Sequence, residues 1–317
     1  MAKTRLFFVT DLHGSNVCFR KFINAAKFYD AQVLVLGGDI TGKVITPILD
    51  NGDGTYTAVH LGNTVEAKGK EGLASITKTM GDSGAYPFVT DPRGLQQFKE
   101  QATEREKLFS RLILERLREW MKLAEERLRG SGVMCYISPG NDDIIEIDEV
   151  LNSSDYVINP EEKVVSIDDE HEMVTLGYTN HTPWHSPREV DEEVLSDKID
   201  AMLTQVKDVK KSLFNLHVPP IDTSIDQAPK VSEELKYVTK GGQVEMTSAG
   251  SSSVRRAIER HQPLLGVHGH IHESRGVANI GRTLCANPGS EYGEGILRGF
   301  LADLDGDRVR SYLLTSG

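Results

Sequence analysis

Acidic and imidazole side chains follow short apolar runs in this chain. The run 6–9 leads into Asp11 and His13, and the run 33–36 leads through two glycines into Asp39. Apolar residues at helical spacing over 19–29 predict a helix between the two strands. Because a right-handed crossover places such strand ends side by side, we expect Asp11, His13 and Asp39 to converge. Carboxylate and imidazole groups in this arrangement make half of a metal centre.

Three later apolar runs end in the same way. The run 133–137 precedes Asn141, the run 213–216 precedes His217, and the run 264–267 precedes a cluster of three histidines, namely His268, His270 and His272. A lone histidine or one Asp-x-His pair is a weak signal, but the repetition of the pattern favours a shared site. His268 is the odd member, for which we expect a core role or the orientation of a ligand.

The order of these groups resembles the calcineurin-like metallophosphoesterase family. The family pattern is Asp-x-His, Gly-Asp, Gly-Asn-His-Asp/Glu, His and Gly-His-x-His. Here it stands as Asp11-Leu-His13, Gly38-Asp39, Gly140-Asn141-Asp142-Asp143, His217 and Gly269-His270-Ile271-His272. The resemblance extends from about residue 4 to about residue 314, apart from an insertion. Within the family, the chain looks most like the bacterial and archaeal phosphoesterases that lack a histidine after Gly-Asn.

The resemblance implies an α/β fold, a four-layer αββα sandwich of two mixed sheets with flanking helices, and two divalent metal ions. One ion would take Asp11, His13, Asp39 and His272, and the other Asp39, Asn141, His217 and His270, with Asp39 bridging. Nitrogen and oxygen ligands without thiolate suit Mn, Fe, Zn, Co or Ni. A bridging hydroxide on the two-metal centre would then attack a phosphate ester.

The remaining segments read as one domain over residues 1–317. An insertion at about 43–90 has strong turn signals and predicts one or two hairpins; it is either a flap over the site or decoration at the rim. A long helical segment is predicted at about 92–129, either continuous or broken into two helices. It begins at Pro92, and its apolar stripe is typical of a helix that packs on the core.

The loop 179–188 combines side chains that suit substrate contact. His181, Trp184 and Arg188 are candidate substrate-binding residues, and a merely solvated loop is the alternative. Asp142 stands where many family members carry a proton-donating histidine. An aspartate near dications should be ionised at neutral pH and a poor acid, so His185 or His181 is the alternative donor.

The bulk composition narrows the function classes. A net charge of -11 argues against nucleic acid as the main partner, and three scattered cysteines fit a reducing, cytoplasmic setting. The apolar run near the start is too short for a membrane span. We expect a metal-dependent phosphoesterase acting on a small phosphate-ester substrate, with a phosphodiester of nucleotide-like size favoured. The alternatives are a non-catalytic interaction scaffold and a phosphomonoesterase or protein phosphatase; the oligomeric state stays open.

Overall fold

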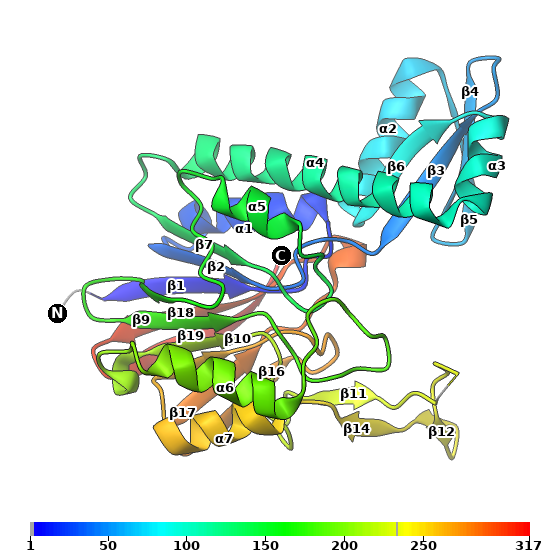
Figure 1. Ribbon diagram of the computed structural model, residues 1–317. Helices are drawn as coiled ribbons and strands as arrows, with labels where there is room; N and C mark the ends of the chain where they lie inside the picture. Colours follow the sequence, from blue (N-terminus) through cyan, green and yellow to red (C-terminus); the bar gives the residue numbers. More distant parts are fainter. Residues whose placement is uncertain (1–2, 233) are drawn as a thin grey trace.

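Two β-sheets pack face to face in the computed structural model, which describes residues 3–232 and 234–317 (Figure 1). The first sheet has five strands in the order β19-β18-β1-β2-β7, and the second has six in the order β16-β17-β15-β10-β9-β8. Their bounds are β1 (Thr4–Val9), β2 (Val33–Gly37), β7 (Met134–Ser138), β18 (Arg298–Asp305) and β19 (Arg308–Ser316), then β8 (Val164–Ser166), β9 (Glu172–Leu176), β10 (Leu213–Leu216), β15 (Leu265–Val267), β16 (Gly276–Ile280) and β17 (Thr283–Asn287).

Helices cover both outer faces of this sandwich (Figure 1). Alternate residues of β1 show why: Leu6 and Phe8 enter the core between the sheets, whereas Phe7 and Val9 enter the core under the helices of the first sheet. That first outer layer holds α1 (Asn16–Phe28), α4 (Ala102–Leu128) and α5 (Ile147–Asn152), and the other outer layer holds α6 (Glu192–Leu203) and α7 (Ser252–His261). The predicted αββα sandwich of mixed sheets is confirmed.

Each sheet contains a block of parallel strands. In the first sheet these are β1, β2 and β7, with β18 and β19 adding antiparallel partners beside β1; in the second they are β9, β10, β15 and β17, with β8 and β16 antiparallel at the two edges. The carboxyl ends of parallel strands meet at one edge, where open α/β sheets place their sites. The loops after β1, β2, β7, β10 and β15 therefore gather at that edge.

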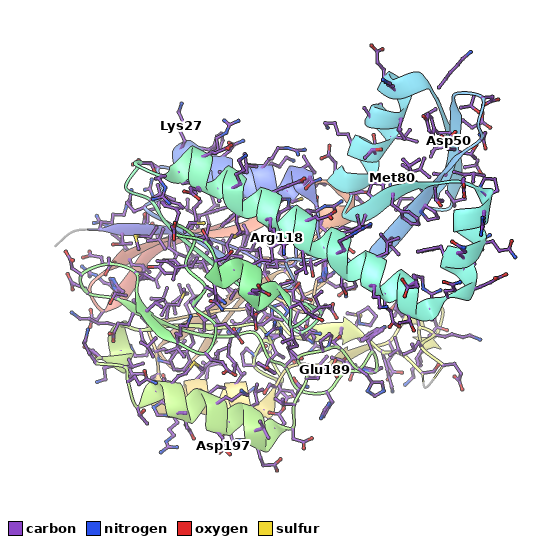
Figure 2. All side chains as sticks on the ribbon, turned by 45° about the horizontal axis from the view of Figure 1, so that its top comes forward. Lys27, Asp50, Met80, Arg118, Glu189 and Asp197 are labelled. Atoms are coloured by element: carbon purple, nitrogen blue, oxygen red, sulfur yellow. The ribbon has the colours of Figure 1, made fainter. Side chains whose placement is uncertain are left out.

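Residues 44–90 form a separate small sheet, here called the insertion subdomain. It contains β3 (Val44–Asp50), β4 (Thr55–His60), β5 (Asn63–Lys68), α2 (Gly69–Asp82) and β6 (Ala85–Thr90), in the strand order β5-β4-β3-β6. The expected hairpins are present. The helix α2 was not predicted from the sequence, although Leu73, Ile76 and Met80 line the side that packs on the sheet. In Figure 2, Asp50 and Met80 mark this subdomain and Asp197 marks the opposite side of the molecule.

The long helical segment is broken in two. α3 (Pro92–Glu100) begins after Asp91, whose Oδ1 accepts a hydrogen bond from the Gly94 N–H at 2.6 Å. Gln101 then interrupts the helix before α4, which reaches from the insertion subdomain across the first sheet (Figure 1). On the sheet, Trp120 of α4 stacks on Phe19 of α1 with ring centroids 4.1 Å apart. α4 thus ties the insertion subdomain to the main body.

An arm of short strands lies within residues 222–250. It contains β11 (Gln227–Pro229), β12 (Thr239–Lys240), β13 (Gln243–Val244) and β14 (Met246–Ser248). Asp226 holds its base, because its buried carboxylate accepts the N–H groups of Asp222 and Thr223, both at 3.0 Å.

A buried histidine away from the strand-end loops carries a proton on both ring nitrogens. His171 Nδ1 lies 2.7 Å from the Asp168 carboxylate and Nε2 lies 2.7 Å from the Gly306 carbonyl. Both partners only accept, so both nitrogens donate. Burial opposes the charge, but the Asp168 carboxylate outweighs it and raises the pKa of His171.

No helix in the described ranges is both long enough and apolar enough to cross a bilayer.

Candidate metal centre

Two loops at the ends of β1 and β2 are joined by backbone hydrogen bonds. The Asp11 N–H donates to the Gly38 carbonyl at 3.0 Å, and the His13 N–H donates to the Asp39 carbonyl at 3.0 Å. Asp11, His13 and Asp39 have positive φ angles of 55°, 40° and 48°. Such left-handed backbone is unfavourable for side chains other than glycine and clusters at functional sites. Here it turns three predicted ligands toward one another.

The first ligand group joins these loops to the end of β15. His272 Nε2 lies 3.1 Å from His13 Nε2 and 3.3 Å from Asp11 Oδ1, and His13 Nε2 lies 3.6 Å from Asp39 Oδ2. Because His13 Nδ1 faces the Thr41 carbonyl at 3.3 Å, its proton belongs on Nδ1 and its Nε2 lone pair faces the group. Burial and the neighbouring His272 hold the pKa of His13 well below its usual range, as suits a metal ligand.

The second ligand group surrounds His217 at the end of β10. Its Nδ1 donates to the Gly37 carbonyl at 2.9 Å, whereas its buried Nε2 has no hydrogen-bond partner. That nitrogen lies 3.4 Å from Asp39 Oδ1 and 3.8 Å from Asp11 Oδ1. A lone pair facing two carboxylates is unfavourable unless a cation or a proton lies between them. The unpartnered Nε2 of His217 beside two carboxylates therefore fits a metal ion at this position.

The last two predicted ligands, Asn141 and His270, contact each other beside His217. His270 Nδ1 lies 2.8 Å from Asn141 Oδ1, and the His270 and His217 rings are 5.6 Å apart. Burial and the charge on His217 lower the pKa of His270 to about 3, so its ring is neutral and available as a ligand. His268 points elsewhere: its Nδ1 meets the Leu216 carbonyl at 2.7 Å.

The charges of the cluster also favour a cation. Burial and repulsion from Asp142 raise the pKa of Asp39 to about 7. Burial opposes charge on His217, but Asp39 and Asp11 outweigh it and raise the pKa of that imidazole to about 10. In the absence of a metal ion, a proton is thus shared among these groups, and a divalent cation bound there would neutralise the same carboxylates instead. Binding of a metal there should release it.

Asp143 clamps the loops that carry the ligands. Its buried carboxylate accepts the Ile40 N–H at 3.0 Å, the Thr41 N–H at 2.8 Å, the Thr41 hydroxyl at 2.5 Å and the Gly140 N–H at 2.8 Å. It thereby joins the loop after β2 to the loop after β7. The motif Gly140-Asn141-Asp142-Asp143 contains this residue, but its role as a clamp was not predicted from the sequence.

Gly140 is required at this junction for reasons of space. A Cβ there would lie 2.3 Å from Asp39 Oδ1 and 2.8 Å from His217 Nε2, so any side chain would displace two predicted ligands.

Asp142, the predicted catalytic residue, lies at the edge of the ligand groups. A carboxylate oxygen of Asp142 lies within 4.8 Å of ligand atoms of both His13 and Asp39. One of its oxygens pairs with the Lys43 ammonium and the other accepts the Ser186 hydroxyl at 2.5 Å. Burial opposes ionisation, but Lys43 outweighs it and holds the pKa of Asp142 well below its usual range. Its role in catalysis stays a prediction.

The loop 179–188 does lie beside Asp142, through the Ser186 contact. Glu189 organises it, accepting the Thr182 hydroxyl at 2.5 Å and the Ser186 N–H at 3.0 Å. Trp184, His181 and His185 are exposed on the loop, Trp184 to 61%. Their roles in substrate binding and proton donation stay predictions.

Arg188 is placed differently from the other loop candidates. Its side chain is 1% exposed and pairs with Asp148 at 2.8 Å, while its Nε donates to the Asp143 carbonyl at 3.1 Å. It therefore holds the loop after β7, and a direct substrate contact stays a prediction. Two further residues at the site, Lys43 and Tyr292, were not predicted from the sequence, because neither belongs to a periodic pattern or a spaced motif. The Tyr292 ring centroid lies 4.8 Å from that of His13.

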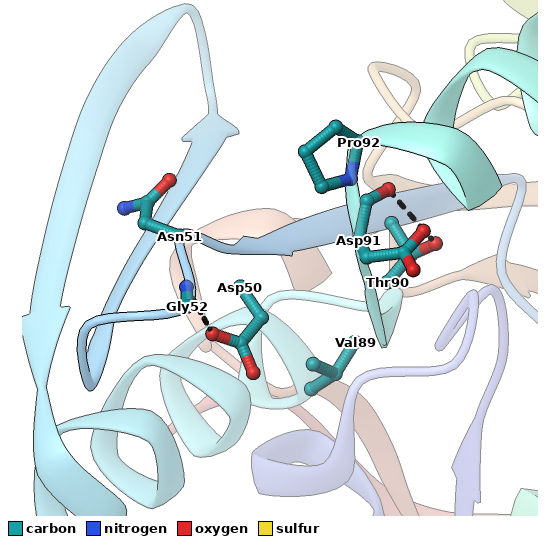
Figure 3. Close-up of a pocket in the computed structure, with 7 residues that line it drawn as sticks. All are labelled: Asp50, Asn51, Gly52, Val89, Thr90, Asp91 and Pro92. Carbon is teal, nitrogen blue, oxygen red and sulfur yellow. Dashed lines mark hydrogen bonds between the residues drawn. The ribbon is translucent and has the colours of Figure 1, made fainter.

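A surface hollow of about 590 Å³ lies at the far ends of β3 and β6 (Figure 3). β3 has seven residues, so the hollow is about 20 Å along the strand from the start of the insertion subdomain. Its acidic side chains have local partners: Asp50 accepts the Gly52 N–H at 2.9 Å and Asp91 caps α3. The hollow is therefore separate from the ligand groups.

Comparisons with known proteins agree with this architecture. No family model matches the chain. An uncharacterised protein of Methanocaldococcus jannaschii is 33% identical over 158 residues, which are 49% of this chain and 63% of that protein. One solved structure shares 16% identity over 99% of both chains with a TM-score of 0.56. TT1561 of Thermus thermophilus shares 14% identity over 100% of this chain and 99% of its own, with a TM-score of 0.53.

An archaeal phosphodiesterase is a weaker match, with 11% identity over 98% of this chain and 100% of its own and a TM-score of 0.37. The two stronger structural matches concern the fold alone. They show that the chain shares with these two proteins a fold of two mixed sheets with helix layers outside them, and the predicted ligand residues lie at the strand ends of that fold.

Proposed function

We propose that this protein is a metal-dependent phosphoesterase that hydrolyses a phosphodiester of a small or nucleotide-like substrate. The observation that carries the proposal is His217, whose buried Nε2 faces the carboxylates of Asp39 and Asp11 without a hydrogen-bond partner. A resident cation gives that nitrogen, and both carboxylates, a partner. Neutral imidazoles and hard oxygens without thiolate fit Mn, Fe, Zn, Co or Ni.

The chain's own groups divide into two ligand sets that share one carboxylate. Asp11, His13, Asp39 and His272 would hold one ion, and Asp39, Asn141, His217 and His270 would hold the other. Divalent ions at these positions would supply a water of lowered pKa and would neutralise phosphoryl oxygens. The Thr41 and Gly37 carbonyls hold the His13 and His217 rings in the required tautomers, and Asp143 keeps the two loops in register.

The charge at the rim favours a diester over a monoester. Asp142 is ionised and is neutralised by Lys43, so this pair adds no net positive charge. A phosphate monoester dianion carries one more negative charge than a diester, so the Asp142 carboxylate would repel it more strongly. A nucleotide-like diester therefore suits the site better, and the net charge of -11 disfavours long nucleic acids.

Proton donation to the leaving group should be weak at this site. Asp142 is ionised, and general acid catalysis is typically worth about 10²–10⁴-fold. Nitrophenolate leaves readily without a proton, so we expect good turnover of nitrophenyl diesters and much slower turnover of alkyl esters. The alternative is that a loop histidine donates the proton. In that case the wild-type protein would hydrolyse aryl and alkyl esters at comparable rates, and His185→Ala or His181→Ala would lower the rate for alkyl esters.

A non-catalytic scaffold of the same fold is the competing function. Elemental analysis of the purified protein, combined with a panel of mono- and diesters in Mn, Ni, Zn and Mg, separates the two. About two metal ions per chain and turnover that disappears in Asp39→Asn support the esterase. Wild-type protein with neither metal nor turnover would support the scaffold, and turnover restricted to monoesters would identify a phosphomonoesterase or protein phosphatase.

A further inference from the structure

The insertion subdomain delivers one charged side chain to the candidate metal centre. Lys43 is the residue immediately before β3, and its ammonium pairs with Asp142. The partner carboxylate is 15% exposed and lies within 4.8 Å of ligand atoms of His13 and Asp39. The Lys43 side chain itself is 51% exposed. A cation thus stands beside the predicted metal ligands and remains accessible from solvent.

The chain around Lys43 is held tightly against the loop after β1. Arg116 of α4 donates to the Gly14 carbonyl at 2.9 Å and to the Ala85 carbonyl at 2.7 Å. Its guanidinium lies 3.9 Å from the Tyr86 ring centroid, and the Tyr86 hydroxyl accepts the Gly42 N–H at 3.1 Å. The residue before Lys43 is therefore connected to the loop that carries Asp11 and His13, so the fold fixes the backbone from which the lysine side chain extends toward Asp142.

Asp142 is equally constrained. Its backbone N–H donates to Asp39 Oδ1 at 3.0 Å, and Ser186 donates to its second carboxylate oxygen. Each oxygen of the carboxylate therefore has a partner, Lys43 on one side and Ser186 on the other. Isolated surface ion pairs contribute little to stability, whereas a pair anchored at both ends beside a ligand cluster is suited to holding the lysine in one place.

We propose that Lys43 binds a phosphoryl oxygen of the substrate and that Asp142 is its positioning residue. An ammonium has three N–H donors; Asp142 takes one, which leaves donors for an oxyanion at the ligand cluster. This inference rests on the proposed phosphoesterase function and names the group that recognises its anionic substrate. It also gives the insertion subdomain a role, since the subdomain begins at the residue after Lys43.

The test uses inorganic phosphate as a probe, so that it does not depend on turnover. Binding to Mn²⁺-loaded protein is measured by calorimetry for wild type, Lys43→Gln, Lys43→Arg and Lys70→Gln, with metal content determined for each. Lys70 is exposed on α2, so its variant makes the same charge change away from the site. We expect Lys43→Gln to weaken phosphate binding at least tenfold, Lys43→Arg to restore most of it and Lys70→Gln to match wild type, all at unchanged metal content.

Asp142 is tested through Lys43 in a double-mutant cycle. If Asp142 acts by positioning the ammonium, Asp142→Asn should weaken phosphate binding in the wild-type background and have no effect in Lys43→Gln. A wild-type Kd for phosphate in Lys43→Gln would overturn the inference about Lys43, and additive effects would overturn the role of Asp142. If wild type binds phosphate through Lys43 but hydrolyses no ester, the proposed function fails while the inference holds.

Discussion

Replacing Asp143 by asparagine should damage the metal centre without removing any ligand. The carboxylate accepts four hydrogen bonds, two at each oxygen, all from donors in the loops after β2 and β7. An amide turns one oxygen into an NH₂ group that faces two donors. Each lost hydrogen bond to a charged group is worth about 1.5–3 kcal/mol, so we expect the free energy of unfolding to fall by about 3–6 kcal/mol.

The loss should appear at the metal ions as well as in stability. Urea denaturation of the protein after its metal has been removed with a chelator measures the free energy of unfolding. Elemental analysis of metal-loaded protein after dialysis measures the metal that is retained. Asp226→Asn is the matched control, because Asp226 is also a buried carboxylate that accepts backbone N–H groups, but at the base of the arm. We expect both variants to lose stability and only Asp143→Asn to lose metal. Loss of less than 1 kcal/mol with full metal content in Asp143→Asn would refute the clamp.

Three further changes have distinct expected outcomes. Asp39→Asn should lower the metal content at both predicted sites, whereas His217→Ala should mainly empty one of them. Anomalous scattering at the metal absorption edge measures the occupancy of each site. Two fully occupied sites in Asp39→Asn would contradict a bridging role for Asp39. Arg188→Ala should lower the free energy of unfolding by about 2–4 kcal/mol because it leaves buried carbonyls unpaired. Trp184→Ala should leave stability unchanged and raise KM for a nitrophenyl diester. A KM within about twofold of the wild-type value would mean that Trp184 does not bind the substrate. The raised pKa of His171 means that its contribution is present below the unfolded value near 6.5 and is lost as pH rises through the folded pKa. The stability difference between wild type and His171→Gln, measured by urea denaturation, should therefore shrink from pH 6 to pH 9, and a pH-independent difference would exclude an imidazolium.

The strand-end residues could be predicted because the signal is local. An apolar run fixes a buried strand, and the polar residue that follows must lie at its end, so Asp39 and His217 needed only strand recognition and the crossover rule. The terminal hairpin across Asp305 and Gly306 was predictable on the same basis, and β18 and β19 form it. The helix α2 was not, since Gly69, Gly72 and Gly81 lower its intrinsic helix propensity.

Groups that act through distant partners left no such signal. Lys43 follows a glycine in a polar stretch of the sequence. Its proposed role depends on pairing with Asp142, which lies in the loop after a different strand. The composition of the loop 179–188 suggests exposed side chains, yet Asp148 and two backbone carbonyls hold the Arg188 side chain inside the protein. Spacing along the chain reports which strand end a residue occupies and does not report which side chains pair across loops.

The junction between insertion and metal centre makes the two parts one mechanical unit. A Cβ on Gly42 would lie 2.6 Å from the His13 carbonyl oxygen, and a Cβ on Gly84, which has a φ of 94°, would lie 2.4 Å from the same atom. The entry of the chain into the insertion subdomain at Gly42 and the turn before β6 at Gly84 therefore both pack directly on the backbone of a predicted ligand. Because packed interiors transmit displacement, movement of β3 and β6 at this junction must move His13 or be resisted by it. The insertion subdomain thus belongs to the structure that positions the site, and Lys43 is the side chain through which it reaches the ligand cluster.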